Sequence, residues 1–305
     1  MQVKKRDVPF IAVFIIPALI LYLMFSFVPN ISPVFYSFFR WKITNWGRAP
    51  FVGFENYVKM FTTEFGMLTK CIGNNLYFSF FGIGIPTLLS LFIAALVTAD
   101  RQKPMPEVNI YRSVIYIPNL VSAAAIAMLW SFIYSPHHGI FNPIFEALGL
   151  KELAATALLG DTRLVKPAIL LSTLWGGIGY YFVIYQSAIY NIPATMYEAA
   201  AIDGSGAVKQ FWHVTLPLIS NTIKTLLMMG CATAFSGGFI GIKIMSDGGP
   251  NYASEILTSY MYRQAFQRGD LGYGSALGTF VLVITVVIYL TVTRLFKNRG
   301  EAYEY

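Results

Sequence analysis

The stretch that decides the fold is PAILLSTLWGGIGYYFVIYQSAIYNIPATMY, residues 167–197, which contains no Asp, Glu, Lys or Arg. A helix rises about 1.5 Å per residue, so about 20 apolar residues cross a hydrocarbon core roughly 30 Å thick. The rest of the chain has the same character: 56% of its 305 residues are hydrophobic and 12% are charged, against roughly 25% charged residues in soluble domains. These proportions indicate a protein embedded in lipid.

Further apolar runs accompany this stretch, and only one of them carries a charge, Lys224. That residue is close enough to the start of its run for the amine to reach the lipid headgroups. Pro17, Pro86 and Pro118 interrupt their runs and should kink the helices. The sequence predicts an all-α, polytopic membrane protein with six transmembrane helices in one domain over residues 1–305, with spans at about 9–29, 72–99, 113–135, 167–190, 218–240 and 271–293.

Basic residues beside the spans indicate which side of the membrane holds the termini, which an even number of spans places together. The two sets of flanks and loops carry similar totals of Lys and Arg, so the totals do not discriminate. The clustered residues favour cytoplasmic termini for a multi-pass protein of the cell membrane; they are Lys4, Lys5, Arg6, Arg101, Lys103, Arg294, Lys297 and Arg299.

The net charge of +7 is explained by these flanks. No basic face with interleaved aromatic residues is present, so nucleic-acid binding is not expected. The first apolar run is too long for a signal peptide, and no small-x-small cleavage site follows it. Cys71 and Cys231 both fall in predicted spans, which argues against a disulfide framework.

Several kinds of chemistry are missing. No G-x-x-x-x-G-K-[ST] stretch predicts a nucleotide site, and neither His137-His138 nor His213 has the spacing of a metal site. Every Asp and Glu lies outside the predicted spans, which argues against a proton relay but leaves sodium coupling through backbone carbonyls open. No Ser, His and acid combination predicts a hydrolase. We therefore expect no catalytic residue, metal or cofactor in this chain.

The polar island EAAAIDGSGAVKQFWHVTLP, residues 198–217, separates the fourth and fifth predicted spans. Residues 195–202 favour a helix, and Gly204-Ser205-Gly206 should end it with a tight turn. The next residues favour a helix again as far as Leu216-Pro217. The island therefore predicts two short helices joined by a glycine elbow at the membrane surface, with an alanine face that allows close docking.

The spacing in this island resembles the EAA motif of inner-membrane permease subunits of ATP-binding-cassette importers. Glu198-Ala199-Ala200 is followed after three residues by Gly204, and later by Val214 and Leu216-Pro217. The family usually has Ile where this chain has Val214, and its carbohydrate branch more often follows the glycine with Ala-Ser or Ala-Gly than with Ser-Gly. The stretches FVGFENYVKMF (51–61), IPNLVSAAAIAMLWSFIYSPHHGIFN (117–142) and SDGGP with TSYMYRQAF (246–250, 258–266) resemble family segments in the same order.

This resemblance implies that the chain is the permease subunit of an importer that moves a sugar or oligosaccharide. Loop 194–217 would be a cytoplasmic coupling loop against an ATPase subunit, and its expected coupling residues are Glu198, Ala199, Ala200, Asp203, Gly204, Leu216 and Pro217. The implied partners are a second permease, two ATPase subunits that bind ATP and Mg, and an extracytoplasmic sugar-binding protein. The bilayer surrounds the chain.

The fourth predicted span is the richest in groups that could hold a neutral polar ligand, because aromatic faces combine there with hydrogen-bonding tips. Its candidates are Thr173, Trp175, Tyr180 and Tyr181, and in the family resemblance Trp175 and Tyr180 match a substrate-lining pattern together with Gly177. Ser122, Gly230 and Ala234 from neighbouring spans are expected to complete the path. No charge projects from these segments, so the substrate should be uncharged.

Three rival functions remain open from the residues alone. An ion-coupled secondary transporter would work without an ATPase, and a membrane-embedded enzyme would need a catalytic constellation that we do not find. A purely scaffolding protein would leave the spacing of the island unexplained. Small residues at 122–127, 176–179 and 236–241 have a simpler interpretation, since they allow helices to pack closely.

Overall fold

The computed structural model describes residues 8–45, 47–98 and 108–297. Helices predominate in these residues, which contain isolated bridges such as Phe39–Phe51 but no strand. The predicted all-α class is thereby confirmed. Parts of the sequence predictions lie outside the described residues, namely Lys4, Lys5, Arg6, Arg101, Lys103, Arg299 and the end of the second predicted span at residue 99.

The chain divides into two compact units, and each is described by itself. Unit 1 comprises residues 1–66 and 261–280, and unit 2 comprises residues 67–260 and 281–305. Unit 1 contains α1 (Val8–Tyr22), η1 (Leu23–Phe27), α2 (Val28–Tyr36), η2 (Ile43–Asn45), α3 (Glu55–Phe61) and η4 (Arg263–Gln267). Unit 2 contains α5 (Val108–Leu120), α6 (Ala123–Ile133), α7 (Phe141–Ala147), α8 (Lys151–Ala154), α9 (Val165–Tyr190), α10 (Ala194–Ile202), α11 (Ala207–Gln210), η3 (Phe211–Thr215), α12 (Leu216–Leu218), α13 (Ser220–Thr233) and α14 (Phe239–Met245). Helices α4 (Phe65–Val97), α15 (Leu257–Tyr262) and α16 (Leu271–Lys297) pass from one unit to the other.

Four helical stretches in the described residues are long and apolar enough to cross a membrane: Val13–Tyr36, Phe65–Val97, Val165–Tyr190 and Leu271–Leu295. They correspond to the first, second, fourth and sixth predicted spans. The other two predicted spans are broken helices, so the described residues contain up to six spans if each bent pair counts as one.

The third predicted span is bent by 95° between Ile110–Leu120 and Ala123–Ile133. Pro118 cannot donate a backbone hydrogen bond and weakens the last turn of α5. A new helix then begins at Ser122, whose hydroxyl accepts a hydrogen bond from the backbone N–H of Ala125 at 3.3 Å. The expected kink at Pro118 is therefore a complete break a few residues beyond it, and a continuous helix over 113–135 is wrong.

The fifth predicted span is also corrected. Helices Ala207–Leu218 and Ser220–Thr233 meet at 63°, and α13 ends at Thr233, short of the predicted end at residue 240. The next five residues, 234–238, are not helical, and Gly238 has a φ of 82° that side chains other than glycine rarely adopt. The small residues at 236–238 therefore do more than pack helices together, because they belong to the non-helical linker 234–238 that leads into α14.

Unit 1 begins with the first span, in which α1 passes through the π-helical turn η1 before α2. The wider turn lies just before Pro29, which has no N–H to give to the residue four positions earlier. Beyond the span, Arg40 forms an ion pair with Glu55, and the Lys59 ammonium lies 3.2 Å from an Asp270 carboxylate oxygen. The first pair lies within the segment after the first span, and the second ties that segment to the residue just before α16.

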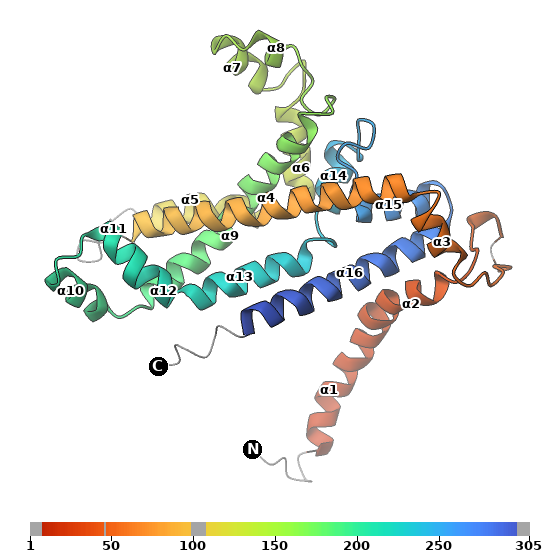
Figure 1. Ribbon diagram of the computed structural model, residues 1–305, viewed down its shortest axis with the longest axis horizontal. Coiled ribbons are helices and arrows are strands. Elements are labelled where there is room, and N and C mark those ends of the chain that lie inside the picture. The colour runs from red at the N-terminus through yellow and green to blue at the C-terminus, as the bar shows by residue number, and fades with distance from the viewer. Residues whose placement is uncertain (1–7, 46, 99–107, 298–305) are drawn as a thin grey trace. The chain divides into compact units, whose positions relative to one another are not determined.

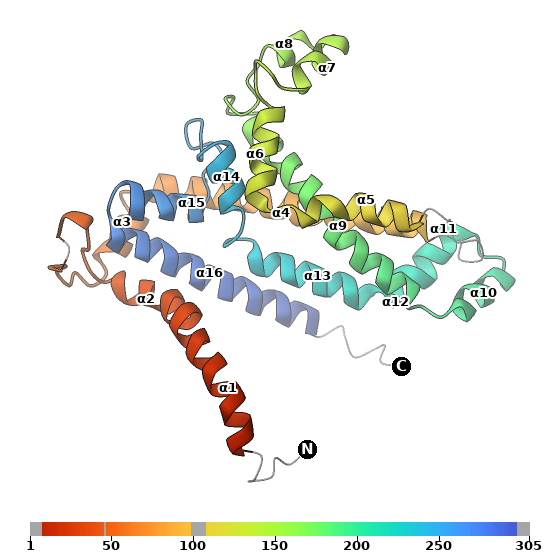
Figure 2. The same ribbon diagram turned by 180° about the vertical axis from the view of Figure 1, so that it is seen from behind.

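Unit 2 is built on helices that lie side by side, as Figures 1 and 2 both show for α4, α5, α9 and α13. The short helices α10, α11 and α12 lie at one end of this group, and α6 and α14 lie toward the other (Figure 1). Close contacts depend on glycines of α9: a Cβ at Gly179 would lie 2.5 Å from the carbonyl oxygen of Ile115 in α5, and one at Gly176 would lie 2.8 Å from Ile126 in α6. The expectation of close packing at 176–179 is confirmed at these two positions.

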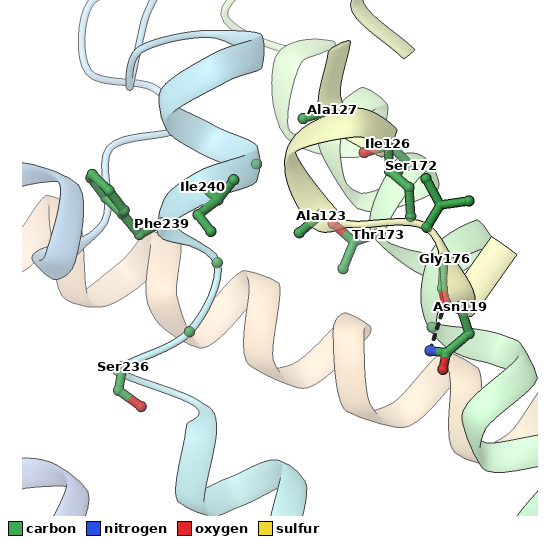
Figure 3. Close-up of a pocket in the computed structure, with 15 residues that line it drawn as sticks. Asn119, Ala123, Ile126, Ala127, Ser172, Thr173, Gly176, Ser236, Phe239 and Ile240 are labelled. Carbon is green, nitrogen blue, oxygen red and sulfur yellow. Dashed lines mark hydrogen bonds between the residues drawn. The ribbon is translucent and has the colours of Figure 1, made fainter. Parts of the chain in front are cut away.

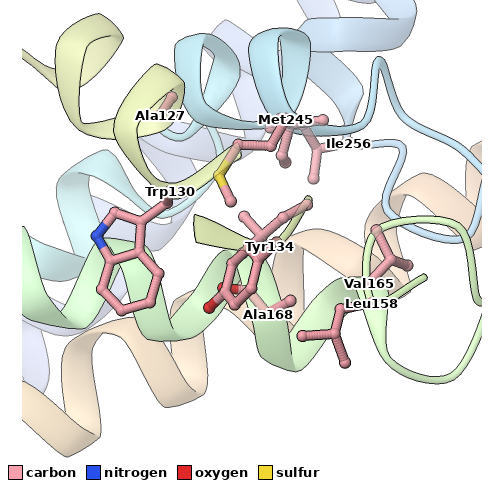
Figure 4. Packing of buried hydrophobic residues seen from close by; sticks show 10 residues of the cluster. Ala127, Trp130, Tyr134, Leu158, Val165, Ala168, Met245 and Ile256 are labelled. Carbon is pink, nitrogen blue, oxygen red and sulfur yellow. The ribbon is translucent and has the colours of Figure 1, made fainter. Parts of the chain in front are cut away.

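Two clusters of buried apolar side chains hold unit 2 together. The α6–α9–α14 core brings Trp130 and Tyr134 against Ala168 and Met245 (Figure 4), and the Tyr134 hydroxyl donates to the carbonyl oxygen of Ala168 at 2.9 Å. The α4–α9–α13 core consists of Leu91, Ala94, Phe182, Tyr185, Ile189, Ile192, Ile219 and Leu226. The first core supports a pocket and the second supports the short helices of the island.

Candidate translocation pocket and coupling elbow

A pocket of about 680 Å³ opens within unit 2 where the break between α5 and α6 and the non-helical segment that leads into α14 meet the continuous helix α9. We call it the main pocket. Its walls are the junction of α5 and α6, the middle of α9, and the linker with the start of α14 at 236–241 (Figure 3). The polar side chains along it are Asn119, Ser172, Thr173 and Ser236, and none of the side chains that line it is charged.

The α5–α6 junction is held against α9 by a side chain. The Asn119 amide donates a hydrogen bond of 3.1 Å to the backbone carbonyl oxygen of Gly176, which Figure 3 shows as a dashed line. The absence of a side chain at Gly176 makes room for Ile126 of α6, because a Cβ there would lie 2.8 Å from the end of the Ile126 side chain. Asn119 therefore fixes one wall of the pocket.

A smaller pocket of about 170 Å³ lies next to the main one and shares Thr173, Gly237 and Gly238 with it. We call it the inner pocket. It is lined by α4 residues including Asn75 and Ser79, by α9, and by the end of α13. Both pockets are bounded by the linker 234–238, so any movement of this linker changes both of them.

Half of the predicted path residues line these pockets. Thr173 and Gly177 line the main pocket, and Gly230 and Ala234 line the inner pocket together with Thr173. Ser122 caps α6 between two lining residues of the main pocket but does not itself line it.

The aromatic candidates lie elsewhere on α9. Thr173 and Gly177 are four residues apart and share a helix face, whereas Trp175 is two residues from each and points to a different face. The Trp175 side chain is 40% exposed, and its ring lies 6.0 Å from that of Trp130, edge to face. Tyr180 and Tyr181 pack against each other at 5.7 Å, outside both pockets. The structure of this chain alone does not bring these three residues into the pockets.

Asn119, Asn75, Ser79 and the linker residues other than Ala234 were not among the path residues that the sequence analysis predicted. A signal for Asn119 was present, because an amide that directly follows a proline inside an apolar run must find a hydrogen-bond partner. The linker contains two adjacent glycines, Gly237 and Gly238, which we interpreted as residues that allow helices to pack closely. Asn75 and Ser79 also lie in an apolar run, but nothing in the sequence identifies their shared partner, which is more than 150 residues away.

The island forms the predicted pair of short helices, and its local geometry explains the glycine. Gly204 has a φ of 76°, and its N–H donates to the carbonyl oxygen of Ala201 at 3.0 Å while the N–H of Ser205 donates to that of Ala200 at 2.9 Å. This is the Schellman arrangement that ends many helices. A Cβ at Gly204 would meet no atom of the described residues within 4 Å. Within the described residues, only the positive φ restricts which residue fits at position 204. A partner protein bound there would restrict the side chain as well.

One side of this coupling elbow (residues 194–218) is anchored, and the other is free. Tyr197 and Thr215 share a hydrogen bond of 2.8 Å across it, and Tyr197, Phe211 and Leu216 pack against the α4–α9–α13 core. The outward side carries Glu198, Ala199, Asp203, Gly204 and Pro217, all exposed, with Ala200 half-buried. Large apolar side chains are exposed there too, Ile202 at 87% and Trp212 at 58%. A rigid, partly apolar surface of this kind suits contact with another protein.

The described residues contain no group of three or more His, Cys, Asp or Glu that could hold a metal ion. His213 contacts the carbonyl oxygen of Lys209 one turn earlier, and the rings of His137 and His138 are 6.4 Å apart. Cys71 and Cys231 are not joined in a disulfide.

Comparison with known proteins shows which family of proteins this chain is similar to. The family described as "Binding-protein-dependent transport system inner membrane component" matches residues 76–299. The probable ABC transporter permease protein YurN of Bacillus subtilis is 31% identical over 301 residues, which are 98% of this chain and 99% of YurN. The diacetylchitobiose uptake system permease protein NgcF of Streptomyces coelicolor is 28% identical, over 92% of this chain and 80% of its own.

The fold also matches a solved structure. A chain in the crystal structure of a bacterial ABC transporter involved in the import of the acidic polysaccharide alginate superposes with a TM-score of 0.84. The match covers 97% of this chain and 98% of the other, at 23% identity.

Proposed function

The chain belongs to the family of binding-protein-dependent transport system inner membrane components, and we propose that it is the permease subunit that carries a sugar or oligosaccharide through the cell membrane in an ATP-driven importer. The observation that carries this proposal is the main pocket, which is uncharged, has a few polar side chains among mostly apolar ones, and lies where the α5–α6 break and the linker 234–238 meet α9. Hydroxyl and amide groups among apolar walls suit a neutral ligand rich in hydroxyls. The relative NgcF, named for uptake of diacetylchitobiose, supports the same substrate class.

The coupling elbow is the proposed contact with the ATPase. Its alanine and glycine surface allows close approach, and Glu198 and Asp203 offer charges for a cationic partner. Leu216 connects the elbow to the α4–α9–α13 core, so a push on the elbow reaches the helices that wall the inner pocket. ATP and Mg would be bound by two ATPase subunits, and a second permease would complete the path.

The proposed orientation follows from this contact. The elbow must lie on the cytoplasmic side if it meets an ATPase there, and with six spans both termini lie on that side too. An extracytoplasmic sugar-binding protein would deliver the ligand at the opposite side. The family description, which names dependence on a binding protein, supports that partner.

Purification of the tagged chain from its native cell in mild detergent tests the proposal. We expect an ATPase and a second permease to copurify, and ATP hydrolysis to rise when a ligand-loaded binding protein is added. In proteoliposomes the complex should take up a neutral oligosaccharide such as diacetylchitobiose and discriminate against an acidic alginate oligosaccharide. Ion-driven accumulation of solute by this chain alone would overturn the proposal in favour of a secondary transporter.

A further inference from the structure

Two adjacent asparagines on α4 are buried and have their hydrogen bonds divided between different parts of unit 2. Asn74 is 5% exposed and Asn75 is 2% exposed. A buried amide is costly unless its donors and acceptor are bonded, so each partner is a constraint on where the neighbouring segments can lie.

Asn75 and Ser79 converge on one carbonyl. The Asn75 amide nitrogen donates to the backbone oxygen of Ala234 at 3.3 Å, and the Ser79 hydroxyl donates to the same oxygen at 2.8 Å. The Asn75 side-chain oxygen accepts from the backbone N–H of Leu257 at 2.9 Å. We call the two donors on Ala234 the linker clamp.

Because of where Ala234 lies, the linker clamp does more than hold two helices together. The last carbonyls of a helix have no partner within it, and Ala234 is the first residue after α13, at the start of the linker 234–238. Gly237 and Gly238 of the same linker line both pockets. The clamp therefore fixes the point where α13 passes into the pocket wall.

Helix α13 connects this point to the coupling elbow. Ile219, at the bend between α12 and α13, and Leu226 are buried in the α4–α9–α13 core. Farther along α13, a Cβ at Gly230 would lie 2.8 Å from Ile83 of α4, so the two helices touch closely just before the clamp. A displacement of α13 must either carry α4 with it or break the clamp, and a shift of the non-helical residues 234–238 would then change both pockets.

Building on the proposed function, we propose that Asn75 and Ser79 are positioning residues for transport: by holding the Ala234 carbonyl they latch the linker 234–238, and release of this latch converts movement of α13 into opening of the pocket wall. Neither residue needs to touch the substrate. Asn74 provides the matched control, because its amide donates to the carbonyl oxygen of Glu255 at 2.8 Å and its side-chain oxygen accepts from Lys166 at 3.4 Å, with no contact to Ala234.

The test uses the whole importer in lipid nanodiscs, with Cys71→Ala, Cys231→Ala and Ser236→Cys in this chain. The rate of modification of residue 236 by a water-soluble maleimide is measured without nucleotide and after trapping with ATP and vanadate. We expect a slow rate in one state and a faster rate in the other. Asn75→Ala should raise the slow rate about tenfold, the scale of losing one buried hydrogen bond, and Ser79→Ala should raise it in the same direction.

Two further variants and the Asn74→Ala control keep the test decisive. Asn75→Asp, nearly isosteric, keeps the acceptor for Leu257 and should raise the slow rate even if Asn75→Ala does not assemble. Ser79→Thr keeps a hydroxyl donor, so the slow labelling rate of this variant should equal that of the parent. Asn74→Ala should leave the slow rate unchanged. The latch is overturned if Asn75→Asp and Ser79→Ala leave the slow rate unchanged, or if Asn74→Ala raises it equally.

The importer without substitutions at Asn74, Asn75 or Ser79 separates a failure of the latch from a failure of the proposed function. Labelling independent of nucleotide in a complex that hydrolyses ATP and transports would overturn the latch alone. A purified complex that contains no ATPase would overturn the proposed function, and the latch with it.

Discussion

The coupling elbow and the main pocket differ in what fixes their geometry. The elbow depends on neighbours in the sequence: the N–H groups of Gly204 and Ser205 donate to the carbonyl oxygens of Ala201 and Ala200, so its turn is formed within residues 200–205. The pocket depends on distant segments, since the Asn119 side chain forms a hydrogen bond to Gly176. The end of the linker and the start of α14, residues 236–241, supply the opposite wall. A local motif can be recognised in a sequence, whereas a pocket made by separate helices has to be assembled first.

The largest expected effect breaks the elbow. Gly204→Val should abolish transport, because a β-branched residue at a φ of 76° adds strain of order 1–3 kcal/mol and its side chain projects from the proposed docking surface. Uptake and copurification of the ATPase are the measurements. Gly206→Ala is the matched control, since Gly206 has a φ of −74° and open space around it.

Gly204→Asn separates strain from docking. Asparagine tolerates a positive φ better than other residues that carry a side chain, so this variant keeps the turn and adds only the outward side chain. Loss of ATPase binding in Gly204→Asn would locate the defect at the contact surface. Normal transport in Gly204→Val would contradict the proposed role of the elbow.

The next effect breaks the frame of the pocket. Gly179→Ala places a Cβ 2.5 Å from a backbone oxygen of α5, and overpacking of this kind costs about 1–3 kcal/mol. Gly177→Ala meets nothing within 4 Å but lines the main pocket. Thermal unfolding in detergent should therefore show a lower midpoint for Gly179→Ala only. Equal midpoints for the two variants would argue against the close packing of α5 on α9.

A smaller effect concerns which face of α9 meets the substrate. Thr173→Val removes a hydroxyl at a position shared by both pockets and should raise the half-saturating substrate concentration by about three- to tenfold, as expected for one lost hydrogen bond. Uptake over a range of diacetylchitobiose concentrations measures it. If Trp175→Ala raises this concentration more than Thr173→Val, Trp175 lines the path of the assembled importer and the pockets of the single chain are not the whole binding site.

The smallest effect sharpens the anchoring of the elbow. Tyr197→Phe removes the hydrogen bond to Thr215 and should lower the free energy of unfolding by about 0.5–1.5 kcal/mol. The aromatic ring remains packed on the α4–α9–α13 core, so transport should persist with a modestly lower ratio of uptake to ATP hydrolysis. An unchanged ratio would show that packing of Phe211 and Leu216 is sufficient to hold the elbow.

Much of the fold was predictable because membrane spans obey simple rules of length and polarity. The runs at 72–99 and 167–190 closely match α4 and α9. The breaks were less predictable: Pro118 signalled a kink, but the position of the new helix start depended on the Ser122 cap. In the linker, two adjacent glycines fit both close helix packing and a non-helical segment. Which of the two forms depends on the contacts at the end of α13, where Asn75 and Ser79 bind Ala234.

The candidate site divides in the same way. Thr173 was found as a hydrogen-bonding group in an apolar span, Gly177 was found through the family resemblance, and the elbow was found from the spacing of Glu198, Gly204 and Pro217. Trp175 and Tyr180 were chosen for their chemistry, which does not say which way a helix face turns. Asn75 and Ser79 could not be found, because their shared partner, Ala234, is more than 150 residues away.

The sequence by itself determined that this is a helical membrane protein with a short two-helix elbow between its fourth and fifth hydrophobic segments. Hydrophobicity over 20 residues and the turn chemistry of a glycine are local properties, so they can be read without a structure. Only the tertiary structure decided where the helices break, which face of α9 borders the pockets and that α4 holds the linker at Ala234. Those features come from contacts between distant segments, whose energies exist only once the helices have packed.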